Sequence, residues 1–124
     1  MKRFLPLVIT LALGQALQAQ KMRDVFAAMP DSVLGIMTKN NRLDCIDFIE
    51  NTMAAKVHNR FDGDTELKAL TVDYLELQLT KNCRVEMKLL PSEDTLYYIC
   101  VARTYSGPMA ETKVALYTPD WETL

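Results

Sequence analysis

Two neighbouring segments of the chain alternate strictly between apolar and polar residues. Residues 75–80 read Leu-Glu-Leu-Gln-Leu-Thr, and residues 84–89 read Arg-Val-Glu-Met-Lys-Leu. Because successive side chains of a β-strand point to opposite faces, this period of two predicts two half-buried strands. Matching their apolar faces places Leu79 opposite Val85 and leaves residues 81–83 as the connecting loop. The two segments are therefore expected to form an antiparallel hairpin with one apolar face.

Two later segments extend this hairpin. Residues 96–103 form a strand that is apolar on both faces, so its register is left undetermined by the pattern. The chain then breaks at Gly107-Pro108, and residues 112–118 predict a fourth strand. Cys83 is expected in the turn of the first hairpin. Residues 56–61 also alternate and 62–64 read as a turn, whereas residues 65–70 show no clear pattern.

Helices are predicted ahead of the strands. Residues 21–29 and 33–37 favour two short helices, and a longer one is expected from Asn40 or Asn41, as N-cap, to about Ala55. Phe48 lies opposite the apolar stripe of the longer helix, which indicates a contact on its far side. The fold class is therefore α+β, with N-terminal helices packed on one face of an antiparallel four-stranded meander. The stripe itself consists of Leu43, Ile46, Ile49 and Met53.

The first twenty residues have the pattern of a secretory signal peptide. Lys2 and Arg3 precede an apolar run over residues 4–13, and the small residue Ala19 suits a cleavage site. We expect residues 1–19 to be the signal peptide and residues 20–124 to form a single α+β domain, located in the periplasm or outside the cell. No later segment holds about 18 consecutive apolar residues, so no membrane span is expected.

The net charge limits the classes of partner that can be expected, and the cysteine count limits the disulfides. The chain has 14 basic and 16 acidic residues and a net charge of −2, which does not suit binding to a phosphate backbone. No nucleic acid partner is therefore expected. Export permits a disulfide, but three cysteines cannot all pair within one chain, and the state of Cys45, Cys83 and Cys100 stays open. Oligomeric state and ligand are not specified by the sequence.

No catalytic set can be recognised in the sequence. His58 is the single histidine, and it alternates with Lys56 and Arg60 on a strand face expected to be solvated. The serines lie in turn-like surroundings without nucleophile-elbow glycines. Whether the protein is an enzyme stays open, and the pattern favours an exported, non-enzymatic binding or protein-interaction module of unknown function.

The last two strands supply the expected binding surface. Because they are apolar on both faces, one face needs cover from a loop, another chain or a ligand. We expect this surface to serve a protein partner or self-association, without a cofactor. Its residues are Tyr97, Ile99, Val101 and Tyr117, with Phe48 from the long helix.

A metal site is the rival interpretation. Asp62, Asp64 and Glu66 alternate as in a calcium loop, and Asp73 falls at the twelfth position. The sixth position, where such loops need glycine, is Leu67. A calcium-stabilised domain or a metal-assisted hydrolase that uses these acids is therefore the alternative, with Ca²⁺ as its ion.

A resemblance to a known family rests on four segments, which are Met29–Ser32, Thr38–Phe48, Val85–Pro91 and Tyr117–Trp121. They resemble a family of uncharacterised secreted proteins from Gram-negative gut bacteria that carry a domain of unknown function. The resemblance implies export and an α+β fold and assigns no activity. Members of the family continue for tens of residues beyond the segment that corresponds to Asp120-Trp121, so this chain is expected to be a short or truncated member. A third hypothesis for its function is therefore an incomplete fragment of a longer secreted protein.

Overall fold

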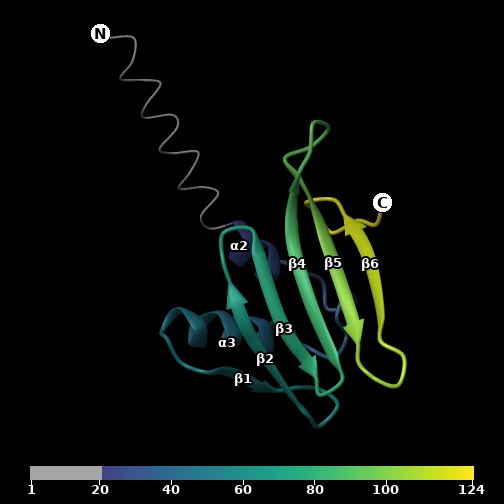
Figure 1. Cartoon of the computed structure of the whole chain (residues 1–124). Helices are drawn as coiled ribbons and strands as arrows, with labels where there is room; N and C mark the ends of the chain where they lie inside the picture. The colour runs from purple at the N-terminus through teal and green to yellow at the C-terminus, as the bar shows by residue number, and fades with distance from the viewer. Residues whose placement is uncertain (1–20) are drawn as a thin grey trace.

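The computed structural model describes residues 21–124, so the expected signal peptide, residues 1–19, lies outside the described part. Two helices in this part precede a continuous series of strands (Figure 1). No helix in residues 21–124 is long and apolar enough to cross a membrane. The elements are α2 (Lys21–Ala27), α3 (Lys39–Glu50), β1 (Ala55–His58), β2 (Asp64–Leu70), β3 (Tyr74–Thr80), β4 (Cys83–Pro91), β5 (Tyr97–Tyr105) and β6 (Glu111–Tyr117).

The strands form one antiparallel sheet of six strands in the order of the sequence. The α+β class and the meander are confirmed, whereas the prediction of four strands is wrong because β1 and β2 also join the sheet. A register shift between Leu67 and Ala69 interrupts β2. Such a bulge breaks the alternation of side chains, which explains why residues 65–70 show no clear period.

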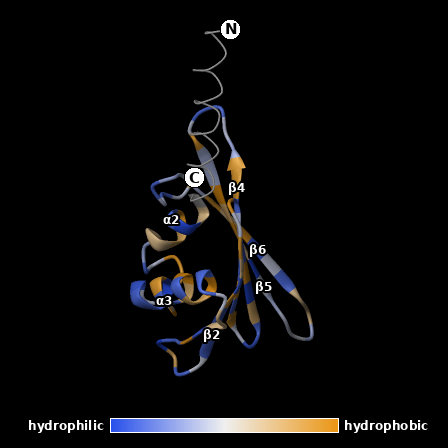
Figure 2. Ribbon diagram, turned by 90° about the vertical axis from the view of Figure 1, so that its left-hand side faces the viewer, coloured by the Kyte–Doolittle hydropathy of each residue, from blue (hydrophilic) through white to orange (hydrophobic). Residues whose placement is uncertain are grey.

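Both helices cover the same face of the sheet, as the edge-on view shows (Figure 2). The core lies between this helical layer and the sheet and includes Met22 and Phe26 of α2 together with Leu75, Leu77 and Met87 of the hairpin. All five side chains are fully shielded from solvent. The opposite face carries no helix (Figure 2), and we call it the helix-free face.

The hairpin of β3 and β4 has the predicted faces but another register. Leu77, and not Leu79, lies opposite Val85, and the register shifts between Gln78 and Thr80. Thr80 then pairs with Cys83, so the turn contains two residues instead of three. The bulge absorbs one residue, which an argument from facing parity alone does not detect.

Helix α3 is shorter than expected and turned about its axis. Thr38 is its N-cap and forms a capping box with Asn41, in place of the expected cap at position 40 or 41. The helix ends at Glu50, and its apolar residue Leu43 is 42% exposed. Its buried residues are Arg42, Cys45 and Ile46.

Two arginines fix the segment between the helices, where residues 33–37 form turns and not the expected helix. Arg42 from α3 donates to the backbone oxygen of Met29 at 2.5 Å and to the carboxylate of Asp31 at 2.9 Å. Arg103 from β5 donates to the backbone oxygen of Val33. These charged donors satisfy carbonyls that have no partner within a helix or sheet.

The C-terminal residues close the core beside α2. The indole nitrogen of Trp121 donates to the backbone oxygen of Val25 at 3.0 Å. Its ring packs on Tyr117 with centroids 5.2 Å apart. Trp121 adopts φ 64°, a left-handed conformation that is costly for a bulky residue. The turn over residues 118–121 is held by this packing and by the hydrogen bond from the amide of Trp121 to the backbone oxygen of Thr118 at 2.9 Å.

Candidate functional site

The binding surface expected from the sequence lies in the core. Ile99 is 0% exposed, Val101 is 1% exposed and Tyr117 is 8% exposed. Tyr97 and Phe48 are partly buried and pack against the same core. The four strand residues face the helical layer and Phe48 of α3 packs against the same core, so the prediction that these residues form an exposed surface is wrong.

The alternate residues of the same two strands face outward. Cys100 pairs with Leu116, and Ala102 pairs with Val114, across the β5–β6 ladder. Val114 is 63% exposed and Leu116 is 40% exposed. The second face of these strands is thus apolar, as the sequence indicates, but the residues that form it are the opposite set. We call it the β5–β6 patch, and it consists of Tyr98, Cys100, Ala102, Val114 and Leu116.

The helix-free face becomes polar from β4 to β1. Glu76 and Glu86 lie directly opposite each other on β3 and β4. The hydroxyl of Tyr74 donates to Glu86 at 2.7 Å and also lies 3.3 Å from Glu76. The hydrogen bond to Glu86, followed by burial, raises the pKa of Tyr74 to about 12. A phenol held in its protonated form thus separates two carboxylates that would otherwise repel each other.

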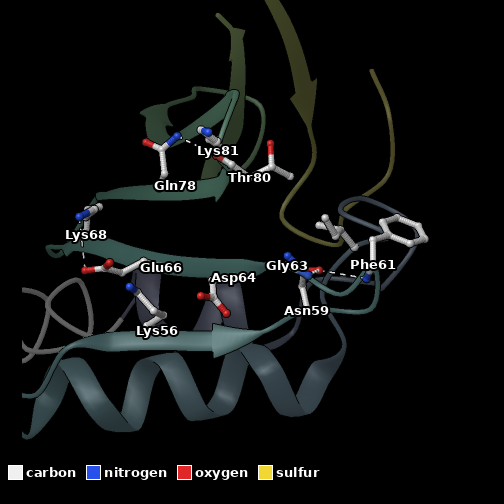
Figure 3. A pocket seen from close by; sticks show the side chains of 11 residues that line it. Lys56, Asn59, Phe61, Gly63, Asp64, Glu66, Lys68, Gln78, Thr80 and Lys81 are labelled. Carbon is white, nitrogen blue, oxygen red and sulfur yellow. Dashed lines mark hydrogen bonds and ion pairs between the residues drawn. The ribbon is translucent and has the colours of Figure 1, made fainter.

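A hollow of about 500 Å³ is lined by residues of β1, β2 and β3 and of the turn between β1 and β2 (Figure 3). Its walls carry three ammonium groups and two carboxylates as well as amide and hydroxyl groups, and Phe61, which is 75% exposed, lies at one side. The lining residues with charged side chains are Lys56, Lys68, Lys81, Asp64 and Glu66.

The carboxylates of this hollow already have basic neighbours. Glu66 lies 3.4 Å from the ammonium group of Lys68, and Lys56 is its cross-strand partner. Asp64 lies 3.6 Å from the imidazole of His58. A bare cation would compete with these positive groups, so the hollow is better suited to a polar ligand that presents both signs of charge.

His58 lies at the end of β1 between two aspartates. Its Nε2 is 2.9 Å from Asp62, and its Nδ1 is 3.6 Å from Asp64. The hydrogen bond to Asp62 is the main cause that raises the pKa of His58 above 6.5. The imidazolium neutralises the turn between β1 and β2, where Asp62 adopts φ 64°. His58 is 64% exposed, which agrees with the solvated face expected from the sequence.

The acidic residues of the rival metal interpretation do not form one site. Asp62 and Asp64 contact His58 at one end of β2, and Glu66 contacts Lys68. Asp73 lies in the turn at the other end of β2, where its backbone oxygen accepts from Leu89. Within residues 21–124, no group of three or more His, Cys, Asp or Glu side chains is arranged to hold a metal ion. The prediction that these four acids form one cluster is therefore wrong.

All three cysteines are free thiols. Cys45 and Cys83 are buried on the core side, and burial is the main cause that raises the pKa of both, for Cys45 to about 11. Cys100 belongs to the β5–β6 patch and lies opposite Lys88 on β4. Cys83 and Cys100 thus face opposite sides of the sheet, which excludes a bridge between them in this fold.

The outward residues of β5 were not predicted as a binding surface, although the sequence pattern contains them. Tyr98 and Cys100 belong to one of two alternating sets, and both sets are apolar. The burial of Arg42 was also not predicted, because a charged residue on a helix is normally expected to face solvent. In the structure Arg42 is only 1% exposed. A buried arginine requires knowledge of the carbonyls that surround it, and these come from a separate turn.

Comparisons with known proteins identify a family whose function is unknown. Residues 14–124 match the model of a family described as "Protein of unknown function (DUF3256)". A solved structure described as a domain of an uncharacterized protein from Porphyromonas gingivalis W83 is similar, with a TM-score of 0.70 and 27% identity. The match covers 86% of this chain and 54% of that one, so the chain spans about half of the solved protein's length. No curated protein matches the chain.

Proposed function

Since the chain belongs to the DUF3256 family, whose function is unknown, we propose that it is an exported, non-catalytic module that binds a protein partner through the β5–β6 patch. The observation that carries this proposal is the contrast between the two halves of the helix-free face. Charged and hydrogen-bonded side chains cover most of β1 to β4, whereas the outward side chains of β5 and β6 are apolar except for Thr104 and Thr112, whose hydroxyls lie 3.1 Å apart.

The exposure of Val114 and Leu116 gives the patch its driving force for binding. They are 63% and 40% exposed, respectively. Full burial of an aliphatic side chain contributes roughly 1.5–3 kcal/mol, so covering the exposed part of each supplies about 1 kcal/mol. Contiguous apolar surface bordered by polar residues is typical of protein contacts.

The polar border supports recognition of a protein over a lipid surface. Lys88 lies beside Cys100 on β4, and Arg84 and Glu86 form an ion pair of 3.4 Å on the same strand. Charges of both signs next to an apolar centre match the anatomy of protein interfaces, where a polar rim surrounds a hydrophobic core.

Export is supported by the basic start, the apolar run and the small residue Ala19 in the first twenty residues. Mass spectrometry of the mature protein tests it. We expect a chain that begins at Gln20, and a protein that retains Met1 in the cytoplasm would contradict export.

Site-specific photo-cross-linking in the native cell tests the binding surface. A photoreactive residue at Val114 should give a discrete cross-linked protein, and the same residue at Lys56, on the polar half, is the matched control. A cross-link obtained only from position 56, or none from position 114, would overturn the proposed surface. Leu116→Lys should abolish the cross-link from position 114, while Lys68→Glu should leave it unchanged.

A further inference from the structure

The outer edge of β6 offers unpaired backbone groups. The strand is the last in the sheet, and residues 111–116 are all exposed. Figure 1 shows no element beyond β6 apart from the C-terminal residues. Such an edge is a template for another strand.

The C-terminal residues show which backbone groups point outward. The amide of Leu124 donates to the oxygen of Leu116 at 3.2 Å, and Tyr117 forms an antiparallel bridge with Thr123. Because the direction of backbone groups alternates along an antiparallel strand, Thr112 and Val114 also point to the outer edge. The described residues supply no partner strand for these two.

The charged side chains of β6 have no ion-pair partner within residues 21–124 of one copy. Lys113 lies opposite Arg103 on β5, so two positive side chains share one face of the ladder. No acidic side chain of residues 21–124 forms an ion pair with either of them. Glu111 lies on the same face as Lys113, opposite Tyr105, and likewise has no basic partner.

From these observations we propose that β6 pairs with β6 of a second copy of this chain, antiparallel and with the two-fold axis at Thr112. Residues that oppose each other share a face, so in this register Glu111 lies opposite Lys113 of the second copy, and the reverse pair forms by symmetry. Val114 lies opposite Ala110 of the second copy, the residue that directly precedes β6. The unpaired charges and the outward backbone groups are satisfied together.

Neighbouring two-fold registers are worse. An axis at Lys113 brings the two Lys113 side chains together, and like charges directly opposite destabilise a strand pair. An axis at Val114 requires the backbone oxygen of Leu116, which already accepts from Leu124.

This inference goes beyond the proposed function, since the dimer uses the outer edge of β6 and not the outward face of the β5–β6 patch. The two fail separately. Loss of self-association leaves a cross-link to another protein at position 114 unaffected, whereas absence of any foreign cross-linked protein does not remove a dimer in purified protein.

A charge-swap cycle followed by sedimentation equilibrium tests the pairing. Glu111→Lys and Lys113→Glu should each weaken the dimer by about tenfold, because each places like charges opposite each other at two symmetric positions. The double variant restores opposite charges and should recover the wild-type dissociation constant. Thermal unfolding of each variant shows whether the monomer fold is retained.

Val114→Pro gives a second test that does not depend on charge. Proline is tolerated on an edge strand but removes the outward N–H, so the dimer should be lost while the circular dichroism spectrum stays the same. Val114→Ala keeps the N–H and should retain the dimer. A wild-type protein that remains monomeric at its highest soluble concentration would overturn the proposal, as would a dimer that neither single charge reversal weakens.

Discussion

Replacement of Ile99 by alanine tests the assignment of faces in β5. Ile99 is 0% exposed and lies between Leu89 and Tyr117 in the sheet. Truncation of a buried isoleucine to alanine lowers the free energy of unfolding by about 2–5 kcal/mol. Ile99 is fully shielded and has a neighbouring strand on each side, so its truncation should fall in the upper half of this range, at about 3–4 kcal/mol. A domain of this size has a free energy of unfolding of about 5–15 kcal/mol, so the variant should still fold.

Leu116→Ala is the matched control, because it removes an aliphatic side chain from the opposite face of the neighbouring strand. Leu116 is 40% exposed, so its truncation should cost about 1 kcal/mol. Urea denaturation, monitored by tryptophan fluorescence, measures the loss in free energy of unfolding for both variants. With a slope of about 1.5 kcal/mol per molar urea, the midpoint of Ile99→Ala should fall by about 2 M and that of Leu116→Ala by well under 1 M. Equal costs for the two substitutions, or a larger cost for Leu116→Ala, would refute the assignment.

Three further predictions concern polar contacts. Arg42→Met should lower the free energy of unfolding by about 3 kcal/mol, because the backbone oxygen of Met29 loses a charged donor; urea denaturation measures this. The stabilising contribution of His58 should be fully present below pH 6.5 and be lost as the pH rises through its raised folded pKa, and His58→Gln should lack this change in thermal unfolding. Tyr74 should ionise near pH 12 in ultraviolet titration, and Glu86→Gln should lower that value, since Glu86 is the main cause of the shift.

The hairpin of β3 and β4 could be predicted because each of its strands has one apolar and one polar face. Leu75 and Leu77 are buried, as expected, whereas Glu76 and Gln78 face the other side. The predicted register was wrong by two residues, since Leu77 and not Leu79 lies opposite Val85, because a bulge between Gln78 and Thr80 changes the turn without changing the pattern of the strands. Local alternation therefore specifies faces better than it specifies partners.

The faces of β5 could not be predicted from the same argument. Both alternating sets of the strand are apolar, so neither set is marked as the buried one. The choice depends on the position of β5 beside β4, where Val101 lies opposite Met87 of the core face. That pairing is a long-range contact with no local signature, and it determines which residues are available to a partner.

Helix α3 shows a different limit. Its stripe was predicted from apolar residues alone, but Arg42 and Cys45 belong to its buried face. Arg42 is buried because Met29 and Asp31 supply acceptors from a turn earlier in the chain. A pattern of apolar residues cannot predict that a charged residue is buried when the groups that pair with it are brought near only by the fold.

Thiol labelling of the native protein tests most directly whether the outward side of β5 is open. Two of the three cysteines lie in the core, Cys45 on α3 with 0% exposure and Cys83 on β4 with 5% exposure, whereas Cys100 lies within the β5–β6 patch. A soluble thiol reagent should therefore modify one cysteine rapidly, identified as Cys100 by peptide mass mapping, and reach the other two only after denaturation. Rapid modification of Cys45 or Cys83, or protection of Cys100 equal to theirs in the monomer, would contradict the placement of the patch.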